Sequence, residues 1–96
     1  MPTYVVLYTF TDQGAKNVKS TLQRARDNQT ESERRGFTIR GVYWTQGRYD
    51  MVVVADAPDE QAMLAALLNI AGAGNVRSET LRAFTAEEME QVLQKL

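Results

Sequence analysis

The sequence predicts an α+β domain with the element order βαββαβ, in which two helices cover one face of a four-stranded antiparallel sheet. One additional helix follows at the C-terminal end of this open-faced sandwich. Two observations support the prediction. Residues 4–10 and 50–55 are apolar without alternation, which is typical of strands buried on both faces in the middle of a sheet. Helical patterns follow both segments. The 96 residues have the length of one domain, so the predicted domain spans residues 1–96.

The first part of the chain predicts a strand and a long helix. Residues 4–10 are β-branched and aromatic and predict the first strand. Thr11 offers an N-cap, and residues 13–35 predict a helix with a kink or irregular turn at residues 28–30. Gly36 is expected to end it. The apolar stripe of this helix is narrow and consists of Ala15, Val18, Leu22 and Ala25.

Residues 37–56 predict a β-hairpin that turns at Gly47-Arg48-Tyr49-Asp50. Gly47 can adopt the positive φ of a tight turn, so we assign it a structural role. Residues 50–55 form the third strand. Alternation along the second strand predicts that one face carries Phe37, Ile39 and Tyr43 and the other carries Thr38, Arg40, Val42 and Trp44.

The C-terminal part predicts a helix, a strand and a short terminal helix. Pro58 opens the first of these helices, whose buried face contains Met63, Ala66, Leu67 and Ile70. Residues 76–84 predict the fourth strand. Thr85 and Glu88 form a capping box for a terminal helix with Met89, Val92, Leu93 and Leu96. This order is that of a ferredoxin-like sheet, 4-1-3-2, whose middle strands are the two most apolar ones here.

The apolar character of both sheet faces predicts a homo-oligomer. The two crossover helices can cover only one face. The other face would expose more than the ~300–600 Å² patch that monomers tolerate. We therefore expect a homodimer or higher homo-oligomer formed through the sheet face. The alternative is that the terminal helix folds back over the sheet.

Cysteine and histidine are both absent. Their absence excludes thiol or imidazole catalysis, Cys/His zinc sites and histidine-ligated haem. We expect no cofactor, and no acidic cluster has the spacing of an EF-hand metal site. The net charge of -1, from 11 basic and 12 acidic residues, argues against nucleic acid as a partner. The N-terminus lacks signal-peptide features and no apolar run could span a membrane, so we expect a cytoplasmic protein without membrane contact.

The stretch Val42–Asp50 resembles the signature of the GYD family, which is named after the residues that are Gly47, Tyr49 and Asp50 here. The resemblance extends over nearly the whole chain and implies a fold akin to the dimeric α+β barrels. It brings no assigned activity. The hairpin and strand order are also similar, more distantly, to the effector-binding domain of Lrp/AsnC-type regulators. The helix-turn-helix that precedes such domains is missing.

Six residues are candidates for contact with a small ligand: Tyr43, Trp44, Tyr49, Asp50, Asn75 and Arg82. The structural alternatives are aromatic packing, a turn conformation for Asn75, and an Asp50 carboxylate that pins the turn rather than acting as a base. The strand arginines, which include Arg40 and Arg77, are either rim charges paired with Glu79 or an anion clamp.

Three functions fit these residues. The first is a non-catalytic oligomeric module that binds a small molecule or a partner protein, with no catalytic residues assigned. The second is a cofactor-independent monooxygenase or isomerase that acts on a small aromatic substrate through Trp44, Tyr49, Asp50 and Asn75. It requires a closed cavity of ~300 Å³ or more that Asp50 or Asn75 reaches. The third is an Lrp/AsnC-like regulatory domain.

Overall fold

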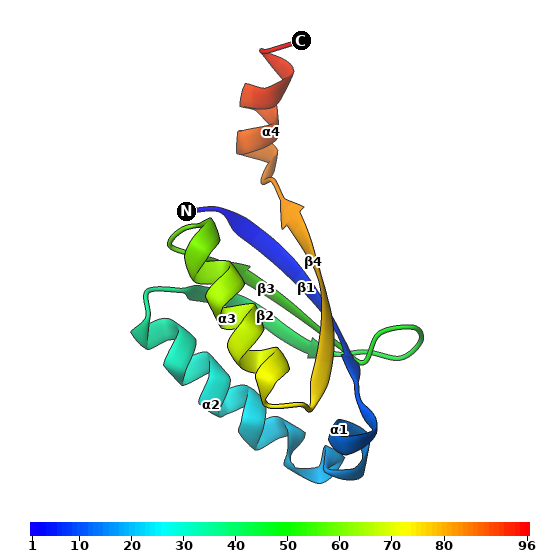
Figure 1. The fold of residues 1–96 in the computed structure, drawn as a ribbon. Coiled ribbons are helices and arrows are strands. Elements are labelled where there is room, and N and C mark those ends of the chain that lie inside the picture. Colours follow the sequence, from blue (N-terminus) through cyan, green and yellow to red (C-terminus); the bar gives the residue numbers. More distant parts are fainter.

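A computed structural model describes residues 1–96 and contains one antiparallel sheet with the strand order β2-β3-β1-β4 (Figure 1). The predicted α+β fold of the ferredoxin-like type is therefore confirmed, with the two most apolar strands in the middle. The elements in chain order are β1 (Thr3–Phe10), α1 (Asp12–Lys16), the 3-10 helix η1 (Val18–Ser20), α2 (Thr21–Arg34), β2 (Thr38–Trp44), β3 (Met51–Asp56), α3 (Glu60–Gly72), β4 (Val76–Ala83) and α4 (Ala86–Leu93).

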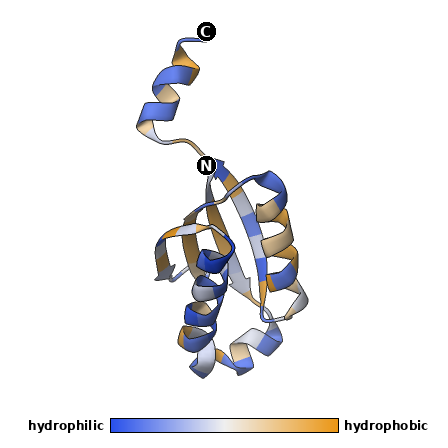
Figure 2. Cartoon of the chain, turned by 90° about the vertical axis from the view of Figure 1, so that its left-hand side faces the viewer, coloured by the Kyte–Doolittle hydropathy of each residue, from blue (hydrophilic) through white to orange (hydrophobic).

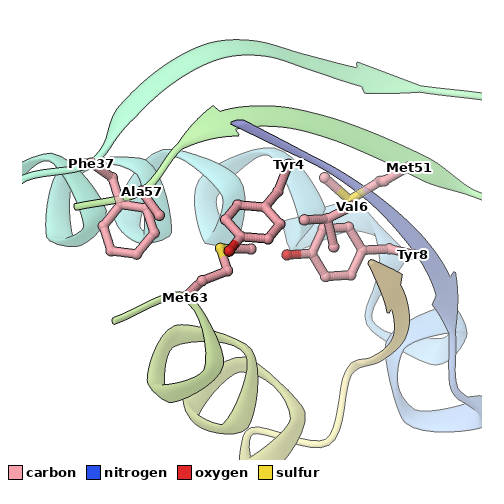
Figure 3. Close-up of a cluster of buried hydrophobic side chains, with 7 residues drawn as sticks. All are labelled: Tyr4, Val6, Tyr8, Phe37, Met51, Ala57 and Met63. Atoms are coloured by element: carbon pink, nitrogen blue, oxygen red, sulfur yellow. The ribbon is translucent and has the colours of Figure 1, made fainter. Parts of the chain in front are cut away.

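The buried core lies between the sheet and helices α2 and α3, which cover one face (Figures 1 and 3). The even-numbered side chains of β1 point toward these helices and the odd-numbered ones toward the opposite face. Val6 is the most deeply buried large side chain of the protein, with 1% of its surface exposed. The core cluster consists of Tyr4, Val6, Tyr8, Phe37, Met51, Ala57 and Met63.

The helix expected over residues 13–35 is divided near Asn17, and the predicted kink at residues 28–30 is wrong, because α2 runs unbroken through them. At the division, the hydroxyl of Ser20 and Nη1 of Arg24 both donate to the Asn17 carbonyl, each at 2.9 Å. In a continuous helix this carbonyl would accept from the N–H four residues further on, whereas here it accepts from the Ser20 N–H at 3.1 Å and from these two side chains. No residue of α2 is buried.

A β-bulge in β2 changes which of its side chains share a face. Consecutive residues of β3 lie opposite Ile39 and Gly41, so Arg40 is an extra residue. The extra residue reverses the alternation beyond it. Ile39 and Val42 therefore both pack against the core, whereas Tyr43 points to the opposite face. The predictions that Ile39 shares a face with Tyr43, and Arg40 with Val42, are wrong for this reason.

The second face of the sheet, which we call the open face, has no helix over it (Figure 1). All four strands contribute to it. Leu81 of β4 lies opposite Val5 of β1, and its side chain is 47% exposed. The apolar side chains of the open face are Val5, Leu7, Tyr43, Val52, Val54 and Leu81.

Helix α4 stands clear of the sheet beyond the end of β4 (Figures 1 and 2). The alternative in which the terminal helix covers the open face is therefore wrong. Both bonds of the predicted capping box are present: the Thr85 hydroxyl accepts from the Glu88 N–H, and the Glu88 carboxylate accepts from the Thr85 N–H. None of the helices is long and apolar enough to cross a membrane.

Candidate functional site

A cleft of about 240 Å³ lies between the helix-covered face of the sheet and helices α2 and α3. Its floor is formed by strand side chains that include Val6, Tyr8, Met51 and Val53. The α3 side is apolar and includes Met63, Ala66, Leu67 and Ile70. The α2 side is polar and includes Thr21, Arg24, Asn28, Gln29 and Ser32. The cleft is thus apolar on two sides and polar on the third.

Two polar groups of the cleft stand out. Arg24 is the only charged residue among the 23 that line it. Tyr8 is 7% exposed and its ring lies among the core side chains (Figure 3). Burial raises the pKa of the Tyr8 phenol to about 12, so the group stays protonated at neutral pH. The cleft therefore offers one permanent cation and, from its floor, a phenol hydroxyl donor.

Two of the predicted site residues lie at this cleft. Asn75 lines it, and its side-chain oxygen accepts a 3.0 Å hydrogen bond from Nε2 of Gln13. Trp44 is 41% exposed and reaches α2, where Nε1 donates to the hydroxyl of Thr21 at 3.1 Å. Thr21 itself lines the cleft. The indole ring thus lies beside the polar side of the cleft.

Asp50 does not line the cleft. Its Oδ2 accepts a 2.8 Å hydrogen bond from the backbone N–H of Phe10, and its own N–H donates to the Tyr8 carbonyl at 2.8 Å. Its carbonyl accepts from the Thr45 N–H at 2.9 Å and closes the hairpin. Asp50 therefore ties the hairpin to the end of β1. This arrangement leaves the enzyme hypothesis without its proposed base, in a cleft smaller than the ~300 Å³ it requires.

The other three predicted residues lie apart from the cleft. Tyr43 is 61% exposed on the open face. The Tyr49 hydroxyl donates to the Glu79 carboxylate, and this bond raises the pKa of Tyr49. Arg82 donates to the Thr3 carbonyl at 3.2 Å and stacks 4.4 Å above the Phe84 ring, at the α4 end of β4. The six candidates therefore do not converge on one site.

A charged cluster that the sequence did not reveal lies at the edge of the open face. Nε of Arg40 donates to Oδ2 of Asp56 at 2.7 Å, and the Thr3 hydroxyl donates to Oδ1 at 2.6 Å. The hydrogen bond from Arg40 is the main reason that the pKa of Asp56 lies below its usual range. The expected pairing of the strand arginines with Glu79 is wrong for Arg40, whose partner is Asp56. Nowhere in residues 1–96 do three acidic side chains converge on a possible metal site.

Comparison with known proteins gives one family and one relative. The model of the GYD domain family matches residues 4–93. A protein of Thermus thermophilus, described as a glutamine synthetase and cystathionine beta-lyase binding protein, is 36% identical over 91 residues. The alignment covers 93% of this chain and 95% of the relative. No solved structure gives a significant match.

Proposed function

Because the chain belongs to the GYD domain family, we propose that it is a non-catalytic dimeric module that binds other proteins, with residues 1–96 acting as one unit. The observation that carries the proposal is the apolar open face of the sheet. A contiguous apolar surface contributed by four strands is removed from water most effectively by another protein surface.

The occupant that best fits the open face is the same face of a second copy. A two-fold axis would pair Val5, Leu7, Val52 and Val54 of one chain with their counterparts in the other, so both sides match in extent and apolar character. The formal net charge is only -1, so two copies repel each other weakly.

The sheet face alone is too small for a stable dimer. Neighbouring strands lie ~4.8 Å apart and rise ~3.4 Å per residue. A sheet face of four strands with about six residues each therefore has an area of roughly 400 Å², which we call its footprint. One such footprint does not exceed the ~300–600 Å² expected above, but it equals the largest apolar patch of a typical monomer, which is often functional. Two such footprints total roughly 800 Å², below the ~1,200–2,000 Å² of stable interfaces. Helix α4 can supply the difference, because Met89, Val92 and Leu93 are 43%, 37% and 53% exposed on it. We infer that α4 packs on the partner copy.

We expect Leu81→Arg to convert the dimer into a monomer. Leu81 is already half exposed in a single chain, so the substitution leaves the fold intact but places an unpaired guanidinium in the interface. The measurement is sedimentation velocity at micromolar concentration, where the unmodified protein should have the mass of two chains. Leu68→Arg, on the outer side of α3 with a 64% exposed leucine, is the matched control and should stay dimeric. A single-chain mass for the unmodified protein contradicts the dimer.

The protein partners that we propose are metabolic enzymes, as named for the Thermus relative, which would place the chain in the cytoplasm. The surface that we assign to them is the hairpin tip, residues 45–49, which projects beyond the sheet (Figure 1). The Arg48 guanidinium lies 5.8 Å from the centre of the Tyr49 ring. Arginine and tyrosine are enriched among the residues that dominate binding energy at protein interfaces.

We expect Arg48→Ala to weaken enzyme binding by about tenfold, or roughly 1.4 kcal/mol, which lies between the ~1 kcal/mol of a contributing interface residue and the ~2 kcal/mol of a dominant one. The measurement is calorimetric titration of purified glutamine synthetase and cystathionine beta-lyase from the same host. Arg34→Ala, on exposed α2, is the control and should bind like the unmodified protein. If neither enzyme binds the protein at ~100 µM, the assignment of these partners is wrong.

A further inference from the structure

We propose that the cleft between the sheet and helices α2 and α3 binds a small monocarboxylate with an apolar body. The inference goes beyond the proposed protein-binding function, because the cleft lies on the opposite side of the sheet from the open face. It rests on a mismatch within the cleft. Sixteen of its 23 lining residues are hydrophobic, yet one side carries a cation that nothing in the chain neutralises.

Arg24 supplies the first hydrogen-bond donor of the cleft. Its Nη1 donates to the Asn17 carbonyl and to the Ser20 hydroxyl, which holds the guanidinium in place at the start of α2. Its Nη2 is shielded from solvent and has no hydrogen-bond partner. No carboxylate pairs with Arg24, and no acidic residue lines the cleft. A shielded guanidinium donor without an acceptor is unfavourable, and an incoming carboxylate would provide the acceptor.

Tyr8 supplies a second donor from the floor of the cleft. Tyr8 is 7% exposed, and its hydroxyl makes no hydrogen bond within the chain. The hydroxyl is not among the fully shielded unpaired atoms, so it is accessible from the cleft that Tyr8 lines. An acceptor group in the cleft would give this hydroxyl the partner that the chain does not provide.

The volume and lining of the cleft limit the size and the chemical character of the ligand's apolar body. A volume of about 240 Å³ is below the ~300–1,000 Å³ of sites for drug-sized molecules, so the ligand has on the order of ten heavy atoms. Met51 and Met63, which both line the cleft, are flexible enough to pack around an aliphatic or an aromatic body. The carboxylate faces α2 and the apolar body lies between the sheet and α3.

The test uses octanoate as the probe, with octan-1-ol as the uncharged molecule of the same length. Calorimetry on the full chain at neutral pH should give one octanoate per chain with a Kd below ~1 mM, and octan-1-ol should bind about tenfold more weakly. Trp44 is the only tryptophan and contacts the cleft residue Thr21, so its fluorescence should change with the same saturation curve. Octanoate that does not saturate by ~10 mM overturns the proposal.

Two substitutions locate the carboxylate. Arg24→Met should weaken octanoate about tenfold or more and leave octan-1-ol unchanged, while Arg26→Met, an exposed arginine on the same helix, should change neither. Tyr8→Phe, which removes only the hydroxyl, should weaken octanoate by up to about tenfold. Equal octanoate affinity in the Arg24→Met and unmodified proteins overturns the assignment. If Arg24→Met does not fold, equal affinity of the unmodified protein for octanoate and octan-1-ol overturns it instead.

Discussion

Replacing Gly14 by alanine should lower the free energy of unfolding by about 3 kcal/mol or more. Gly14 is buried in α1, and a Cβ there would lie 2.0 Å from the carbonyl oxygen of Asn75 and 2.9 Å from its carbonyl carbon. Both atoms are backbone, so no side chain can move aside. The same oxygen accepts a 3.1 Å hydrogen bond from the Thr11 N–H, so moving it breaks the junction between the end of β1 and the start of β4.

The matched control is Gly72→Ala. Gly72 ends α3 and has no atom within 4 Å of the place of a Cβ, so alanine there should be neutral or stabilising by up to about 1 kcal/mol. Thermal unfolding followed by circular dichroism measures both. At ~4–8 °C per kcal/mol for a domain of this size, Gly14→Ala should lower the midpoint by roughly 12 °C or more. A midpoint within ~2 °C of the unmodified protein is incompatible with the close approach at Asn75.

Asp50→Ala should be the second strongly destabilising change, at about 2 kcal/mol. The alanine leaves the N–H of Phe10 without its acceptor in a partly buried position, and it removes the side-chain hydrogen bond between the hairpin and the end of β1. The hydrogen bonds that Asp50 makes through its backbone, to Tyr8 and Thr45, are unaffected by the substitution. The expected loss therefore measures the contribution of the side chain alone.

Asp50→Asn separates the two roles considered for this residue. An asparagine oxygen can still accept from the Phe10 N–H, so most of the lost stability should return, to within about 1 kcal/mol of the unmodified protein in urea unfolding. A carboxylate needed only as a base would give no reason for the asparagine and alanine variants to differ in stability. If the two variants are equally unstable, the acceptor role in the hairpin is wrong.

Features that depend on a short stretch of sequence could be predicted. The unalternated apolar runs at residues 4–10 and 50–55 identified the two central strands, because a strand buried on both faces has no polar positions. The capping box at Thr85 and Glu88 formed as expected because its two hydrogen bonds join residues only three apart.

The bulge at Arg40 was missed although its signal was present. Ile39 and Val42 are both core residues three positions apart, a spacing that regular alternation cannot place on one face. Gly41 marks the irregularity, since a Cβ there would lie 2.7 Å from the Tyr43 ring that covers it. A glycine within a strand generally indicates a bulge or a close approach of another group to the backbone, and Gly41 shows both.

The cleft could not have been predicted, because it depends on contacts between distant segments. Arg24 resembles the other charged residues of its helix in sequence, yet in the folded chain its Nη2 is shielded from solvent. Asp56 acquired its partners in the same way: Thr3 lies 53 positions away along the chain. Pairwise spacing within one helix or strand carries no information about either contact.

The lack of any buried residue in α2 has a consequence for the protein's motions. Helix α3 is anchored by buried Met63, whereas α2 is held mainly by half-buried side chains, so α2 belongs to the least stable part of the domain. Of the two helices that cover the sheet, α2 should therefore lift away first, while the strands stay paired. Small molecules could then enter and leave the interior on the timescale of this opening, without separating the sheet from a protein bound to its far side.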